Sequence, residues 1–408
     1  MLSYNFLLDL ALILLSTKVL GIITKKFQMP QVVGALLAGL ILGPAMFNVL
    51  SETDFIIQLS ELGVIVLMFC AGLESDLQEL KSTGKASFII ASLGVVIPLL
   101  GGFLFAHFFR IPELYNETSG SIILQNIFIG IILTATSVSI TVETLKEMGK
   151  LNTQAGTAIL GAAIIDDILG IIALTIVTSL KDTSISIGLV LFKIIVFFIF
   201  VGVVGFIAYK VFKAWSRYEN RDRRRFIIAS FVFCLLLSYI SEEVFGVADI
   251  TGAFIAGLVL SNIDRKEFIS NRLNIVSYAL LSPVFFASIG LKVVLPKMDL
   301  NVILFAVILT IIAIITKIIG AGIGAKLCKF SNKESIQIGI GMVSRGEVAL
   351  IVASKGAAIG LISTSMLGPV IIVVVATTII SPILLKFAFK ENNIKHKEKS
   401  VTTIRAGR

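Results

Sequence analysis

The residues best suited to chemistry in this sequence are two adjacent carboxylates, Asp166 and Asp167, which lie inside an apolar stretch. A charged side chain at the centre of a membrane helix costs about 2.5–3.5 kcal/mol on insertion scales, so such residues are functional candidates. Neighbouring residues of a helix point about 100° apart. The two carboxylates therefore cannot face one partner together, and we expect them to have two different roles.

A positive charge lies in a second apolar stretch, where Lys317 occupies the middle of the run 300–328. Its depth makes it hard for the amine to reach either membrane surface. A buried carboxylate is the simplest partner, because pairing offsets the cost of removing both charges from water. The residues alone leave open whether Asp166 or Asp167 provides that carboxylate.

A third charged group interrupts the apolar run 334–361 with Ser344, Arg345, Gly346 and Glu347. A glycine between polar residues forms helix poorly, so the pattern predicts an unwound segment inside the membrane. Such a break leaves two half-helices whose exposed dipoles need opposite charges near them. Arg345 and Glu347 can supply those charges, and direct ion binding by these residues is an equal alternative.

A matching interruption is expected in the run 121–144, which contains Thr136 and Ser137. The segment 134–139 supplies hydroxyl and β-branched side chains there. We expect the two broken helices, one in each half of the chain, to cross near the middle of the membrane. Secondary transporters place their binding sites at such crossings.

The composition predicts an all-α polytopic membrane protein. Of the 408 residues, 56% are hydrophobic and 15% are charged, whereas a water-soluble domain is about 25% charged. A spanning helix needs about 20 mostly apolar residues, and thirteen such runs can be read along the chain. They cover approximately 5–24, 30–49, 54–73, 85–109, 121–144, 152–180, 185–212, 223–244, 247–262, 273–291, 300–328, 334–361 and 364–389.

The basic residues indicate how the chain crosses the membrane. The formal net charge is +9, which by itself would fit an acidic or nucleic-acid partner. Twenty-five of the 35 Lys and Arg residues, however, gather in alternate loops on one side and in the final segment. The positive-inside rule places that side in the cytoplasm. An odd number of spans then puts the N-terminus outside and the C-terminus inside, and no nucleic-acid partner is expected.

The chain also repeats itself at an offset of 218 residues. The stretches 34–42 and 252–260 are identical at six of nine positions, and the same offset relates Gly72-Leu73 to Gly290-Leu291. The two matching helices are the second and the ninth, so they cross the membrane in opposite directions. This predicts two inverted repeats, which are a signature of secondary transporters.

Taken together, these motifs resemble the monovalent cation:proton antiporter family 2, and most of all its NapA and GerN type of sodium/proton antiporter. The resemblance covers essentially residues 1–389. It rests on four motifs in order, which are Gly-Leu-Glu at 72–74, Thr-Ala-Thr-Ser at 134–137 before the Asp-Asp pair, Lys317 with Ile-Ile-Gly after it, and Ser-Arg-Gly-Glu at 344–347.

The resemblance implies an NhaA-like fold of about thirteen transmembrane helices, with two inverted repeats and crossed discontinuous helices. It divides the chain into two domains, and the members of the family are usually homodimers. The expected parts are a dimerisation domain at 1–73 and 223–291, a core ion-transport domain at 85–180 and 300–389, a linker helix at 185–213, and a disordered basic cytoplasmic tail at 390–408.

The resemblance also implies roles for single residues. Asp167 would bind the cation, Na⁺, and the proton in turn, while Asp166 would pair with Lys317. Thr136 would lie at the helix crossing beside the ion. The remaining implied residues would stabilise that crossing, and they are Arg345, Glu347 and Ser137.

Glu74 closes the third span near the cytoplasm, and it suits either a cytoplasmic vestibule or an ordinary charge at the membrane surface. The expected function is exchange of Na⁺, with Li⁺ or K⁺ as alternatives, for H⁺ across the cytoplasmic membrane by elevator-like alternating access. The rival is a K⁺/H⁺ antiporter or K⁺ efflux module of Kef type, although the large nucleotide-binding domain of that branch is not expected here. No cofactor is expected besides the transported ions.

Enzyme activity is not expected. An intramembrane aspartyl protease needs two aspartates on different helices that face one water molecule. Asp166 and Asp167 are neighbours on one helix and cannot meet that requirement.

Overall fold

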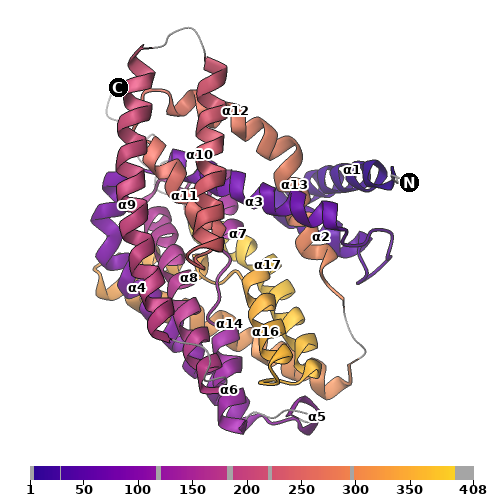
Figure 1. Ribbon diagram of the computed structural model, residues 1–408. Helices are drawn as coiled ribbons and strands as arrows, with labels where there is room; N and C mark the ends of the chain where they lie inside the picture. Colours follow the sequence, from indigo (N-terminus) through magenta and orange to yellow (C-terminus); the bar gives the residue numbers. More distant parts are fainter. Residues whose placement is uncertain are drawn as a thin grey trace, which may run out of the picture.

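The computed structural model describes residues 4–27, 29–115, 121–181, 187–218, 223–294 and 298–390, so the expected basic tail, apart from Lys390, lies outside the described residues. Within these ranges the regular structure is helical and contains no strand (Figure 1). The helices are α1 (Asn5–Lys26), α2 (Gln31–Leu42), α3 (Asp54–Glu74), α4 (Leu77–Phe108), α5 (Pro112–Tyr115), α6 (Ile122–Ile132), α7 (Val138–Glu147), α8 (Gln154–Lys181), α9 (Ile187–Tyr218), α10 (Arg223–Glu243), α11 (Asp249–Leu260), α12 (Lys266–Val276), η1 (Ser277–Leu281), α13 (Ser282–Leu291), α14 (Leu300–Leu327), α15 (Asn332–Gly341), α16 (Glu347–Ala358), η2 (Thr364–Met366) and α17 (Leu367–Phe389).

Nine helical stretches in the described residues are long and apolar enough to cross a membrane, with α12, η1 and α13 counted as one stretch. The other four expected spans fall on the short helices α2 and α11 and on two interrupted pairs, α6 with α7 and α15 with α16. α2 and α11 have 12 residues each. At about 1.5 Å per residue such a helix is shorter than a hydrocarbon core of about 30 Å.

Several predicted helix boundaries are wrong by six to eight residues: the run expected at 273–291 begins at Lys266, and the run expected at 185–212 ends at Tyr218. Two further errors have a clear local cause. The helix expected at 30–49 ends at Leu42, because Gly43 is extended before Pro44, and a residue before proline disfavours helix. The helix expected at 85–109 begins at Leu77. The Asp76 carboxylate accepts hydrogen bonds from two backbone amides of the first turn and thereby starts a helix whose opening residues are polar.

The strongest packing between helices falls into two groups. In the first group α4 packs against α6, α8 and α14, and α14 also packs against α15 and α17. In the second group α2 packs against α1 and α13, while α11 packs against α3 and α10. α9 contacts α8 of the first group and α11 of the second. Figure 1 shows α1, α2 and α13 on one side of the molecule and the long α9 on the opposite side.

Glycine contacts interlock the two repeats within the second group. The bounds of α2 and α11 differ by the same 218 residues that relate their sequences. Gly39 of α2 lies against the backbone of Ala287 in α13, and its repeat partner Gly257 of α11 lies against the backbone of Phe69 in α3. Each repeat therefore packs its second helix on the third span of the other repeat, at a distance that leaves no room for a side chain.

We expect Gly39→Ala to lower the midpoint of thermal unfolding, because the added methyl group would collide with the backbone carbonyl of Ala287. Overpacking of this kind costs about 1–3 kcal/mol. The measurement is the fraction of detergent-solubilised protein that keeps its size-exclusion retention after heating. The matched control is Gly202→Ala on α9, where an added methyl group would meet no heavy atom within 4 Å. Equal midpoints for the two variants would contradict the close packing.

Candidate ion-binding site

Two broken helices meet through their backbones in the first packing group. The unwound segment 133–137 separates α6 from α7, and the unwound segment 342–346 separates α15 from α16. The amide of Ser137 donates to the carbonyl of Ser344 at 2.7 Å, and the Ser344 hydroxyl donates to the carbonyl of Ser137 at 2.9 Å. The two segments therefore provide hydrogen-bond partners for each other in a region where water is scarce.

Hydroxyl groups satisfy further carbonyl groups at this crossing. The Thr141 hydroxyl donates to the carbonyl of Gly341 at 2.8 Å, and its oxygen lies 2.7 Å from the Ser344 hydroxyl oxygen. Thr136 donates to the carbonyl of Met342 over a longer distance of 3.4 Å. The sequence analysis missed Thr141. Its position at the start of α7, four residues after the capping residue Ser137, is the signal that could have identified it.

Arg345 is completely buried and donates hydrogen bonds to three backbone carbonyl groups, one of which lies at a helix end. Its guanidinium donates to the carbonyl of Leu133 at 2.7 Å, to that of Val343 at 3.0 Å, and to that of Ala313 at 3.1 Å. Leu133 is the C-terminal cap of α6, where carbonyl groups lack partners within the helix. A cation at this position also balances the negative end of the helix dipole. The carbonyl of Arg345 in turn accepts a hydrogen bond from Thr378 of α17, another residue that the sequence analysis missed.

Lys317 brings a second buried cation to the same helix end. Its amine donates to the carbonyl of Thr134 at 2.6 Å and lies 2.9 Å from a carboxylate oxygen of Asp166. Neither side chain of this ion pair is more than 1% exposed. Lys317 on α14 therefore joins the broken helix to α8, and it shares its charge between a carbonyl and a carboxylate.

The adjacent aspartates occupy different surroundings. Asp166 is 2% exposed, and the Thr136 hydroxyl lies beside its carboxylate. Asp167 is partly exposed and lies close enough to Lys317 for the two charges to interact. One carboxylate is thus committed to a buried cation, whereas the other belongs to a partly exposed residue.

Two predicted residues, Glu347 and Glu74, have not yet been placed. The side chain of Glu347 lies outside the described residues, although the backbone at this position begins α16. Glu74 lies at the contact of three helices rather than at the crossing. Its carboxylate is 3.1 Å from the amine of Lys146 on α7, and it accepts a hydrogen bond from Asn274 of α12 at 3.0 Å.

Comparison with known sequences shows the family to which the chain belongs. The sequence profile described as "Sodium/hydrogen exchanger, transmembrane" matches residues 11–391. The chain belongs to this family. Similar relatives of this exchanger family include a probable Na⁺/H⁺ antiporter, GerT, of Bacillus cereus, which is 42% identical over 94% of this chain and 99% of the relative.

Two further relatives have comparable coverage. The Na⁺/H⁺-K⁺ antiporter GerN of Bacillus cereus is 37% identical over 95% of this chain and 97% of its own length. A Na⁺/H⁺ antiporter of Enterococcus hirae is 39% identical over 95% of this chain and 99% of its own length. These relatives, which are named as antiporters, match nearly the whole length of this chain.

A solved structure matches the fold. The sodium proton antiporter MjNhaP1 of Methanocaldococcus jannaschii has a TM-score of 0.67 at 20% sequence identity, and the match covers 93% of this chain and 95% of that structure. The expected all-α fold of the sodium/hydrogen exchangers is thereby confirmed.

We expect Lys317→Ala to lower stability by about 3–5 kcal/mol, because it leaves Asp166 charged and buried without a partner. The double variant with Asp166→Ala should recover part of this loss. The measurement is thermal unfolding of the purified protein at pH 8. Lys292→Ala is the control, since Lys292 and Glu52 form a half-exposed pair at 3.6 Å that should contribute about 0–1 kcal/mol. Equal losses of stability for Lys317→Ala and Lys292→Ala would show that the buried ion pair contributes no more to stability than the partly exposed one.

Proposed function

We propose that the chain exchanges Na⁺ for H⁺ across the cytoplasmic membrane, with Asp167 as the site that both ions share. The observation that carries this proposal is the partly exposed Asp167 beside the buried pair of Asp166 and Lys317 at the crossing of two broken helices. Three relatives are named as Na⁺/H⁺ antiporters, which supports the choice of ions.

Competition for one carboxylate explains why transport is exchange and not leak. A bound Na⁺ or a bound proton neutralises Asp167, and a neutral site can pass through the apolar interior at low cost. The empty, ionised carboxylate would carry a net charge through that interior, which is expensive. The loaded forms therefore change sides readily while the empty form does not. No cofactor is needed in this scheme.

The two packing groups suggest which parts move. We assign α4, α6–α8 and α14–α17 to a core ion-transport domain, and α1–α3 and α10–α13 to a dimerisation domain that joins a second copy of the chain. The site lies wholly on the first group, since Asp167 is on α8, Lys317 is on α14 and the crossing joins α6 to α16. Movement of this group as one body would carry the intact site past the second group.

K⁺ is the second candidate ion. The name of GerN includes K⁺ beside Na⁺, and that relative matches almost the whole of this chain. The carboxylate of Asp167 has no inherent preference for either cation, because selectivity depends on cavity size and on the number of ligands. A titration with Na⁺, Li⁺ and K⁺ therefore belongs in the test of the function.

We expect Asp167→Asn to abolish cation-dependent dissipation of a pH gradient, because an amide cannot bind a proton and a cation in turn. The assay uses inside-out vesicles with a fluorescent pH probe, with Na⁺, Li⁺ or K⁺ added after the gradient is formed. The control is Glu113→Gln on α5, an exposed position that lies outside the two unwound segments of the crossing. It makes the matched change from a carboxylate to an amide and should exchange normally. Normal exchange by Asp167→Asn would show that this residue is not the shared site.

A further inference from the structure

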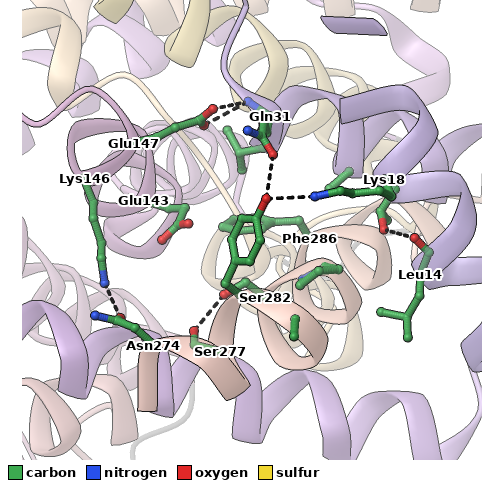
Figure 2. Close-up of a pocket in the computed structure, with 16 residues that line it drawn as sticks. Leu14, Lys18, Gln31, Glu143, Lys146, Glu147, Asn274, Ser277, Ser282 and Phe286 are labelled. Atoms are coloured by element: carbon green, nitrogen blue, oxygen red, sulfur yellow. Dashed lines mark hydrogen bonds between the residues drawn. The ribbon is translucent and has the colours of Figure 1, made fainter. Parts of the chain in front are cut away.

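The last turn of α7 carries a carboxylate that closes onto another helix. The two carboxylate oxygens of Glu147 accept hydrogen bonds from the backbone amide of Gln31, at 2.8 and 2.9 Å (Figure 2). Gln31 is the first residue of α2, where amide groups lack partners within the helix. A carboxylate at this end is favoured also by the helix dipole. Glu147 thus caps a helix of the proposed dimerisation domain from α7, which is assigned to the proposed core domain and also packs against α8 and α17.

The neighbouring residue, Lys146, makes a second connection across the same boundary. Its amine lies 3.1 Å from the Glu74 carboxylate on α3 and donates to the side-chain oxygen of Asn274 on α12 at 2.7 Å. Asn274 also donates to Glu74 at 3.0 Å, so the three side chains form a closed triangle. We call the five residues Gln31, Glu74, Lys146, Glu147 and Asn274 the clasp.

Among the side chains that the structure describes, the equivalent half-helix of the other repeat, α16, shows no comparable attachment. α7 packs against α2 and α3 as well as against α8 and α17. α16 packs against α6 and α17 and, in the described residues, lacks similar packing against α3, α10 or α11. One face of α16 is exposed instead, including Ile351 at 56% and the side chains of Ser354 and Lys355. In the described residues, α7 therefore joins the two proposed domains by direct packing, whereas α16 does not.

A cavity of about 600 Å³ lies beside the clasp, between α7 and the helices α1, α2, η1 and α13. Glu143 of α7 lines it, as do Tyr278 and Phe286 (Figure 2). Tight packing of helices resists sliding, and an unfilled space reduces that resistance. Polar contacts at the clasp, more than close packing along the whole length of α7, therefore hold this end of the boundary together.

We propose that the clasp holds the cytoplasmic side of the transporter closed, so that it sets the balance between the two orientations of the core domain. This inference rests on the proposed exchange and on the proposed placement of the basic side in the cytoplasm. Any movement of α7 past α2 and α3 must break the contacts of Glu147 and Lys146. The clasp residues are positioning residues, and none of them touches the transported ion.

A native thiol can report whether the clasp is open. Cys70 lies on α3, one turn before Glu74, is completely buried, and lies near Lys146 and Glu143 of α7. Separation of α7 from α3 would expose it to a membrane-impermeant maleimide added from the cytoplasmic side of inside-out vesicles. The other two cysteines, Cys234 and Cys328, are replaced by serine so that Cys70 is the single site of labelling.

We expect Glu147→Gln to speed labelling of Cys70 about threefold to tenfold, because the lost charge weakens the cap on α2. The same variant should lower the apparent KM for cytoplasmic Na⁺ with a smaller change in maximal rate. Glu113→Gln, the matched change on exposed α5, should label at the original rate. Equal labelling of the two variants, or labelling only from the opposite side, would overturn the clasp.

A charge exchange separates a specific contact from general loosening. Lys146→Glu and Glu74→Lys should each speed labelling, and the double variant should restore slow labelling, since the pair is re-formed with reversed charges. Failure of the double variant to slow the reaction counts against the proposal. Labelling requires no ion transport, so it can be repeated with Asp167→Asn. Loss of the proposed antiport activity and loss of the clasp therefore give different results.

Discussion

The structure depends on one constraint, which is that a helix broken inside a membrane must still satisfy its backbone. The C-terminal end of α6 presents the carbonyls of Leu133 and Thr134, and two completely buried cations bind them. Arg345 reaches this end from the other broken helix and Lys317 from α14. Without such partners the free carbonyls would cost several kcal/mol each in hydrocarbon. The crossing, the pairing of the two repeats and the position of the aspartates all follow from satisfying this one end.

The same arrangement gives Asp166 and Asp167 different electrostatic surroundings. Two cations at the end of α6 are more positive charge than a helix dipole of about half an elementary charge can balance. Asp166 supplies the additional negative charge through its ion pair with Lys317. In the proposed exchange, Asp167, which points elsewhere on the same helix, is the carboxylate whose charge state changes without dismantling the crossing. Under that proposal, adjacent positions in sequence give one fixed and one exchangeable carboxylate.

Charge in an apolar setting was the most informative part of the sequence. It identified Asp166, Lys317 and Arg345, because ionised groups rarely lie in a membrane without a partner. Contacts that depend on the third dimension could not be read in this way. Thr141 and Thr378 look like ordinary helical threonines, and their roles appear only once the broken backbones are positioned. Helix ends were missed for a related reason: hydropathy ignores capping groups such as Asp76 and extended residues before proline.

The interlocked glycines have a consequence for how the chain is made. α2 needs the backbone of Ala287 in α13, which is synthesised almost 250 residues after Gly39. During translation, therefore, the first repeat enters the bilayer with its tightest helix contact unmade and a glycine face open to lipid or to the translocation machinery. The two halves cannot mature one after the other as separate bodies. Assembly is completed only when α13, the third span of the second repeat, packs against α2, which was synthesised much earlier.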